Sequence, residues 1–528
     1  MPARFQIRGT RPARLAHLVV GITLVAAACS TSGGGGSASD QFLRYAVQME
    51  TQLSGHLDPA ESTNGCDNIV MHWIYGSLTD IDADGNPIPG LAESWELEGR
   101  VFTLHLRAGV TFHDGTPFDA EAVKKGLEYL KRGEQTGEAL RVVDEVEVVD
   151  DLTVRLLLED DTGKVLPLIL SQREGMIVAP DSIDKDSADQ RPVGAGPYTF
   201  KGFEPGRLIS LRPNKLFYDP SHVTLPGIDF VQAPTGSAGV NALLAGDLDL
   251  IIIQEDSLER LERQDDVGVA TALPTIAAPN YVVVQFRTGV PPFDNVLLRQ
   301  AVNYAIDREE INDAVFLDRG QIAWMPFPEG TPSHDPTVAE RYPHDPARAR
   351  ELLEEAGMPG GFEFDLYSPG GGIPFLDRSA ELVQQQLKDV GITANIKRVT
   401  DIPTEYYVQR QGNAFLHSRP AQLDAPGQVI EQFGTGRFVA AFNGAENAEL
   451  TDLATRARST SDPAEFASLM HQAAAIIVDN ALEAAIVFTP RNIAWDETRV
   501  AGDVRAPPGS CTPVDLTKVT LAKNASKG

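Results

Sequence analysis

Residues 345–397 read DPARARELLEEAGMPGGFEFDLYSPGGGIPFLDRSAELVQQQLKDVGITANIK. An Asp-Pro pair opens the first predicted helix, with Asp345 as the N-cap and the proline as the first helical residue. Residues 362–367 are typical of a strand, residues 376–390 form an amphipathic helix, and residues 392–397 return as a strand. A strand, a helix and a second strand at this spacing predict an α/β fold with crossover connections.

The chain is strongly acidic. It has 74 Asp and Glu residues against 45 Lys and Arg residues, which gives a formal net charge of −29. Such a charge repels phosphate backbones, so we expect no nucleic-acid partner. Hydrophobic residues make up 42% of the 528 residues, as in ordinary globular chains. This length predicts about two to four domains.

The first 28 residues have the features of an export signal. Four arginines precede an apolar run over residues 18–28, which is too short to span a bilayer as a mature helix. The run leads directly into Cys29, and the segment resembles a bacterial lipoprotein signal. We predict a signal peptide at 1–28, a Cys29 that carries fatty acyl chains such as palmitate, and a flexible tether at 29–40. A lipid-anchored protein would lie at the outer face of the cell membrane. The alternative is an ordinary secretory signal, which also implies export.

Three cysteines occur in the sequence: Cys29, Cys66 and Cys511. If Cys29 carries lipid, the other two form an even set in an oxidising compartment. We therefore predict a disulfide between Cys66 and Cys511, which requires the two ends of the chain to lie in one domain. The alternative is two unpaired, buried thiols.

No enzyme motif stands out. The ten histidines include no HExxH pair, and no two cysteines lie at the spacing of metal ligands. The segment Gly236-Ser237-Ala238-Gly239 lacks the GxSxG spacing of a nucleophile elbow. We expect no cofactor, no metal site and no enzyme activity.

Several segments, in the same order along the chain, resemble the dipeptide/oligopeptide-binding family (family 5) of the extracellular solute-binding proteins of ABC importers. Together they extend over nearly the whole chain beyond the tether. They are IYGSL (74–78), PGLAESWE (89–96), LHLRAGVTFHDGTPF (104–118), VGAGPY (193–198), LAGDLD (244–249), PPFD (291–294), LRQAVNYAIDR (298–308) and PARARELL (346–353).

This resemblance implies a two-lobed α/β fold of the periplasmic-binding-protein type II kind, with an extra inserted domain. Lobe 1 would combine a main domain of residues 41–83, 198–283 and 499–528 with an inserted domain of residues 84–197. Lobe 2 would comprise residues 284–498. The resemblance also implies a monomer that binds a small solute between the lobes and delivers it to permease subunits in the membrane.

Peptide-binding members of the family carry an acidic residue that pairs with the peptide amine, in a segment resembling Trp-x-Ala-Asp-Tyr-x-x-Pro. Residues 419–426 align with it as RPAQLDAP. Gln422 then stands where the acid belongs, and Arg419 stands where the Trp belongs. A neutral Gln accepts a hydrogen bond from an ammonium without the strength of a charged acceptor. Asp424, two residues further on, would replace the acid if the loop shifts.

Arg287 stands where the family usually shows asparagine. Two arginines, Arg287 and Arg419, near a closing cleft would favour a carboxylate or phosphate ligand. The alternative is that both face solvent or pair with neighbouring acids. Tyr406, Tyr407 and Phe415 would line an apolar pocket, or else belong to the ordinary core.

Three functions follow from these residues. The first is a lipid-anchored receptor that delivers a small peptide to an ABC permease. The second keeps the importer role but makes the solute a non-peptide anion, such as an organic acid or a conjugated metabolite. The third is a surface-tethered enzyme or binder that works without a transporter.

Overall fold

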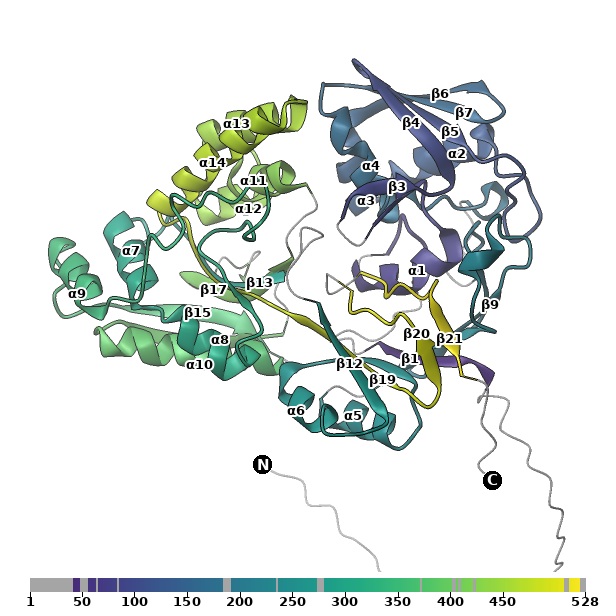
Figure 1. Cartoon of the computed structure of the whole chain (residues 1–528). Coiled ribbons are helices and arrows are strands. Elements are labelled where there is room, and N and C mark those ends of the chain that lie inside the picture. Colours follow the sequence, from purple (N-terminus) through teal and green to yellow (C-terminus); the bar gives the residue numbers. More distant parts are fainter. Residues whose placement is uncertain are drawn as a thin grey trace, which may run out of the picture. The chain divides into compact units, whose positions relative to one another are not determined.

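Three sheets of four or more strands organise the described part of the chain in the computed structural model (Figure 1). The described residues are 41–47, 56–62, 65–82, 85–183, 191–233, 236–272, 280–370, 373–400, 405–406, 409, 411–420, 424–507 and 512–522. The predicted signal peptide and tether, residues 1–40, lie outside them.

A seven-stranded sheet takes its strands from three separate parts of the sequence. In spatial order they are β12 (Val267–Ala272), β19 (Arg491–Asp496), β11 (Leu250–Ile253), β1 (Leu43–Val47), β10 (Ile228–Gln232), β9 (Leu208–Pro213) and β8 (Tyr198–Glu204). β1 pairs in parallel with both β10 and β11. All four residues of β11, Leu-Ile-Ile-Ile, are buried, as expected for a strand that is covered on both faces.

A second, antiparallel sheet is built from strands of the segment that lies between β1 and β8 in the sequence. Its order is β4 (Ala92–Glu98), β5 (Val101–Leu106), β7 (Thr153–Leu158) and β6 (Val143–Asp150). Helix α2 (Ala120–Leu130) packs against it. One continuous hydrophobic core joins the two sheets, with Leu104 and Val154 from the small sheet and Tyr45 and Phe230 from the large one. We call these two sheets and their helices lobe 1.

Lobe 2 is built on a six-stranded mixed sheet. Its order is β14 (Gln321–Ile322), β18 (Glu483–Phe488), β13 (Asn280–Phe286), β17 (Ala414–Pro420), β15 (Glu363–Pro369) and β16 (Thr393–Val399). Four helices share a core with this sheet: α7 (Val296–Ala305), α8 (Arg308–Phe316), α9 (Pro346–Glu355) and α10 (Pro374–Asp389). A separate apolar core joins α11 (Ala425–Phe433), α13 (Ala448–Ser459) and α14 (Pro463–Asp479).

The strand–helix–strand prediction is confirmed. The side chain of Asp345 accepts hydrogen bonds from the backbone N–H groups of Ala347 and Arg348, at 3.0 and 2.9 Å. β15 and β16 pair in parallel along seven residues, on either side of α10. An N-cap of this kind stabilises a helix by about 1 kcal/mol.

The chain passes between the two large sheets at positions that differ from the predicted domain boundaries. The first passage lies between Ala272 of β12 and Asn280 of β13, earlier than the predicted change at residue 284. The return lies at residues 489–490, between β18 and β19, and not at residue 498. β18 and β19 are separated by only two residues, Thr489 and Pro490, so local sequence gives a weak signal for a change of sheet there. The four-stranded sheet lies within the predicted inserted domain, 84–197.

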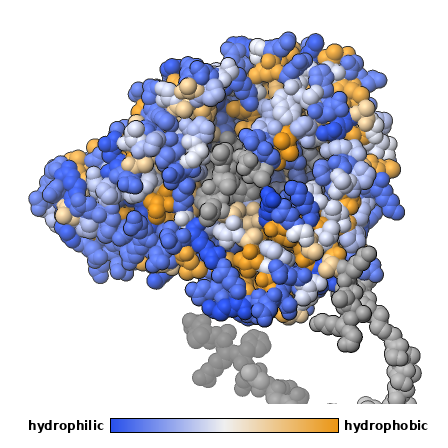
Figure 2. Space-filling view, viewed as in Figure 1, coloured by the Kyte–Doolittle hydropathy of each residue, from blue (hydrophilic) through white to orange (hydrophobic). Residues whose placement is uncertain are grey.

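Hydrophilic residues cover most of one face of the molecule, with apolar residues in scattered patches between them (Figure 2). This distribution agrees with the acidic composition of the chain. Within the described ranges, every helix is too short or too polar to cross a bilayer.

Candidate functional site: a cavity between the lobes

The topology of lobe 2 brings the ends of three strands to one edge of its sheet. β15 pairs in parallel with both β16 and β17, so their carboxyl ends point the same way. Ligands of open α/β sheets bind outside the carboxyl ends of such strands. β17 ends at Pro420, and Asp424 is the residue at the start of the next helix, α11. The sheet therefore directs Asp424 toward a ligand-binding edge.

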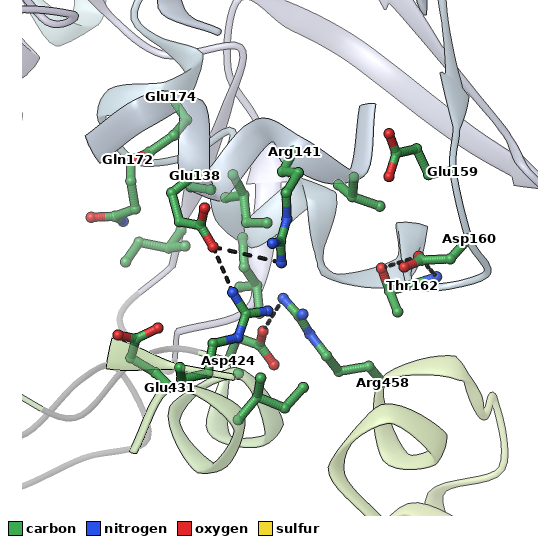
Figure 3. Close-up of a pocket in the computed structure, with 18 of the residues that line it drawn as sticks. Glu138, Arg141, Glu159, Asp160, Thr162, Gln172, Glu174, Asp424, Glu431 and Arg458 are labelled. Atoms are coloured by element: carbon green, nitrogen blue, oxygen red, sulfur yellow. Dashed lines mark hydrogen bonds and ion pairs between the residues drawn. The ribbon is translucent and has the colours of Figure 1, made fainter. Parts of the chain in front are cut away.

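Asp424 lines a cavity of about 570 Å³ whose walls come from both lobes. Figure 3 shows the helical elements of lobe 1 on one side and those of lobe 2 on the other. Lobe 1 contributes α3 (Glu134–Ala139), η3 (Leu140–Val142), α4 (Leu166–Ile169), η5 (Arg173–Gly175) and the turn after β7. Lobe 2 contributes α11, the residue before α12 (Phe438–Asn443), and the end of α13. Its charged lining residues are Glu138, Arg141, Glu159, Asp160, Glu174, Asp424, Glu431, Arg437 and Arg458.

Asp424 and Arg458 form an ion pair on the lobe 2 wall (Figure 3). The Asp424 Oδ2 atom lies 2.5 Å from Arg458 Nη2, and the side chains are 11% and 22% exposed. Burial raises the pKa of Asp424, while Arg458 and the backbone N–H of Gly427 act in the opposite direction. The other carboxylate oxygen, Oδ1, is buried and has no hydrogen-bond partner among the described residues. Asp424 therefore lines the cavity with one carboxylate oxygen that the described residues leave without a hydrogen bond.

Two polar contacts join the lobes beside this cavity. Arg437 Nη1 of lobe 2 lies 2.7 Å from Glu138 Oε1 of lobe 1. The same Glu138 oxygen lies 3.5 Å from Arg141 Nη2. Lys164 Nζ of lobe 1 donates to the backbone carbonyl of Ser459, at the end of α13, over 2.9 Å. The cavity is therefore bordered by direct contacts between its two walls.

Arg419 is buried inside lobe 2 and does not line this cavity. Its Nη1 atom forms an ion pair with Glu483 and donates to Tyr281 Oη at 2.9 Å, while Nη2 donates to Gln285 Oε1. A guanidinium tied to a carboxylate in this way already has the anion that it requires. The sequence left open whether Arg419 binds an anionic ligand or pairs with a neighbouring acid. In the structure it pairs with the acid Glu483.

Arg287 is also buried, at 8% exposure, just after β13. Its Nη1 atom donates to the backbone carbonyl of Gly412 at 2.9 Å. The guanidinium carbon lies 4.7 Å from the ring centre of Phe442, a cation–π geometry. Like Arg419, Arg287 interacts with groups of its own lobe.

Tyr406 and Phe415 belong to one aromatic cluster. Their rings stack with centres 4.7 Å apart, and both residues are at most 2% exposed. Tyr367, Val399 and Phe442 complete the cluster. At this depth the two side chains act as core residues of lobe 2. The remaining predicted lining residues, Tyr407 and Gln422, lie outside the described residues.

Of the three cysteines, only Cys66 lies within the described residues. It precedes helix α1 (Asn68–Tyr75) and packs against the core of lobe 1. Cys29 and Cys511 lie outside those residues, so the lipid anchor and the disulfide stay predictions.

Sequence reasoning found one charged residue of the cavity, Asp424, and missed the others. The acids of lobe 1, such as Glu138 and Glu174, lie about 250 to 290 positions before Asp424 in the sequence. No local motif marks them, because only the folded arrangement of the two lobes brings these residues together. Among the described residues there is no cluster of three or more side chains suited to hold a metal ion.

Residues 86–438 match the model of a known family, described as bacterial extracellular solute-binding proteins, family 5 middle. The chain belongs to this family. This result confirms the resemblance seen in the sequence. Relatives in family 5 are solute-binding proteins, which favours a binding role over an enzymatic one.

Two curated relatives illustrate the range of solutes within the family. The chain is 27% identical to di/tripeptide-binding protein 1 of Pseudomonas aeruginosa over 374 residues, which cover 64% of this chain and 68% of that protein. It is 28% identical to heme-binding protein A of Haemophilus influenzae over 416 residues, which cover 71% of this chain and 74% of that protein. Family membership alone therefore does not define the solute.

The fold of this family 5 chain matches that of solved binding proteins. The periplasmic binding protein DppA of Helicobacter pylori, in complex with the peptide STSA, superposes with a TM-score of 0.76. The match covers 92% of this chain and 99% of that chain, at 22% sequence identity. The predicted two-lobed α/β fold is thereby confirmed.

Proposed function

We propose that this family 5 protein is the extracytoplasmic substrate-binding component of an ABC importer and that its solute is a small peptide. The observation that carries the proposal is the cavity between the two lobes, with the carboxylate of Asp424 in its wall. A cavity of about 570 Å³ is within the range of sites that enclose small molecules. The solute would be enclosed by hinge closure of the lobes and released to the permease.

Asp424 is the residue that we assign to the peptide amine. Arg458 holds one of its carboxylate oxygens, which fixes the orientation of the side chain. The second oxygen is buried without a hydrogen-bond partner among the described residues, and an ammonium group would satisfy it with a charge-assisted hydrogen bond. Asp424 would thus replace the acid that is missing at position 422.

The alternative of an anionic solute is supported less well. It depended on Arg419 and Arg287, and both side chains contact groups of lobe 2 instead. The third hypothesis, an enzyme or a binder without a transporter, is supported less well, because the relatives in family 5 are solute-binding proteins.

The proposal includes anchoring by lipid on Cys29, which would hold the protein at the outer face of the cell membrane. Mass spectrometry of the N-terminal peptide tests it. A peptide that begins at Cys29 and carries the mass of fatty acyl chains would support the anchor. An unmodified cysteine, or a cleavage site elsewhere, would contradict the lipid anchor and favour an ordinary secretory signal.

The solute is tested by purifying the protein gently, denaturing it, and identifying the small molecules it releases by mass spectrometry. Recovery of short peptides supports the proposal. Recovery of a single acidic non-peptide solute contradicts it and restores the anionic alternative. An Asp424→Asn protein, purified in parallel, should release less peptide than the Asp452→Asn control, in which an exposed Asp–Arg pair within α13 is altered.

A further inference from the structure

The cavity lining has more negative than positive side chains. It contains six carboxylates and three guanidiniums, and no lysine or histidine, so it has a formal excess of three negative charges. Lobe 1 supplies this excess, since its wall has four acids and one arginine, whereas the acids and arginines of the lobe 2 wall are equal in number.

Each arginine of the lining already contacts a carboxylate. Arg437 and Arg141 share Glu138, and Arg458 is paired with Asp424. An anionic solute would have to compete with these acids for the guanidinium groups. The other four carboxylates, Glu159, Asp160, Glu174 and Glu431, form no ion pair with any described residue.

Two of these carboxylates, Glu174 and Glu431, come from opposite lobes. Glu174 lies in η5 of lobe 1, and Glu431 lies in α11 of lobe 2. Figure 3 shows Glu174 among the lobe 1 elements on one wall and Glu431 among the lobe 2 elements on the facing wall. Burial raises the pKa of Glu174, while its own backbone N–H and the charge of Arg173 oppose that rise. Glu174 and Glu431 are both half-buried, and a half-buried carboxylate without an ion-pair partner is stabilised by a cation that reaches it.

We infer that the cavity selects positively charged solutes, and that Glu174 and Glu431, unpaired carboxylates on its two walls, attract the ammonium or guanidinium group of the solute. The inference rests on the proposed function for the site and specifies its solute class: basic peptides. Because the two acids belong to different lobes, a cation in the cavity attracts both walls. The charge that selects the solute would therefore favour closure of the lobes around it.

The test compares solutes that differ in charge. The full chain, purified in mild detergent, is titrated by calorimetry at low ionic strength with Ala-Lys-Ala, Ala-Ala-Ala and Ala-Glu-Ala. A matched pair of non-peptides, 1,5-diaminopentane and glutarate, is included. The tested variant is Glu174→Gln with Glu431→Gln. The control is Glu381→Gln, a 59% exposed acid on α10 of lobe 2.

We expect Ala-Lys-Ala to bind at least about tenfold more tightly than Ala-Glu-Ala, since opposite charges at a site favour one partner and repel the other. The double variant should lose most of this preference, the control should keep it, and added salt should reduce it. Equal binding of the three peptides would leave the peptide proposal standing and overturn the charge inference. Binding of 1,5-diaminopentane without any peptide would support selection by positive charge, but it would overturn the assignment to basic peptides and contradict peptide capture. A preference for glutarate or Ala-Glu-Ala, or no binding of any probe, would overturn the inference.

Discussion

Arg437 and Glu138 form an ion pair across the two lobes, with 2.7 Å between Nη1 and Oε1. Glu138 lies in α3 of lobe 1, and Arg437 directly precedes α12 of lobe 2. The pair forms only when these walls approach each other. Its energy therefore acts on the equilibrium between open and closed lobes, in addition to any effect on folding.

Replacing Arg437 by Gln should weaken solute binding slightly. The two side chains are 24% and 55% exposed, and an ion pair in contact with water contributes roughly 0–1 kcal/mol. We expect the dissociation constant for Ala-Lys-Ala to rise about two- to threefold at low salt, and the difference to vanish at high salt. Calorimetry measures both. Arg348→Gln, which alters ion pairs within α9 alone, is the control. A tenfold change, or one that salt leaves untouched, would show that Arg437 contacts the solute.

Breaking the buried pair of Arg419 and Glu483 should destabilise lobe 2. The side chains are 7% and 3% exposed, so Glu483→Gln leaves a buried guanidinium without its carboxylate. The expected loss in the free energy of unfolding is about 3–5 kcal/mol, measured by urea denaturation. A double variant, Arg419→Met with Glu483→Leu, should lose less, because it removes both charges. If Glu483→Gln were as stable as the Glu381→Gln control, the pair would have no structural role.

The outcome for Arg419 shows where prediction from sequence stops. Asp345 and the strands around α10 were predicted correctly, because caps and hydrophobic periodicity are local signals. The partner of Arg419 is 64 positions away in the sequence, so the sequence could not decide between a ligand-binding and a buried arginine. The same holds for the cavity, where Glu174 and Asp424 meet only through the arrangement of two lobes. Alignment with a family motif predicted Asp424 as a site residue. No motif in the sequence marks the acids of lobe 1.

Glu255 should make the stability of the protein depend on pH. It is 6% exposed, and burial raises its pKa from 4.5 to about 7, with Arg491 opposing the rise. Between these two values the folded chain binds more protons at this site than the unfolded chain does. Its contribution to stability is therefore complete below pH 4.5 and is lost as the pH rises to about 7, by about 3 kcal/mol.

A Glu255→Gln variant tests this effect, because Gln can still accept the hydrogen bond that Asn492 Nδ2 donates over 3.2 Å. The variant should match the original protein near pH 4.5 and exceed it in stability above pH 7. Urea denaturation at a series of pH values gives the difference. A difference that stays constant from pH 4.5 to 8 would mean that Glu255 does not titrate in this range.

Cys66 and Cys511 should be joined in the exported protein. In the chain-entropy model, a disulfide that closes so long a loop stabilises the folded state by about 6 kcal/mol, and by less if it is strained. Peptide mapping without reduction should recover the two cysteines in one linked fragment. The single variants Cys66→Ser and Cys511→Ser should lose equal stability, and the double variant should lose no more than either. Two separate peptides with reactive thiols would contradict the pairing.

Asp424→Asn should reduce the affinity for peptides more than any other single change discussed above. The substitution keeps the shape of the side chain and removes the charge that would face the peptide amine. A hydrogen bond to a charged group contributes about 1.5–3 kcal/mol, so we expect the dissociation constant to rise about 10- to 100-fold. Because the variant also leaves Arg458 without its partner, the free energy of unfolding is measured in parallel. An N-acetylated Ala-Lys-Ala separates the two effects: it lacks the free amine, so the original protein and the variant should bind it equally weakly. If acetylation does not weaken binding to the original protein, the amine lies elsewhere and Asp424 serves to hold Arg458.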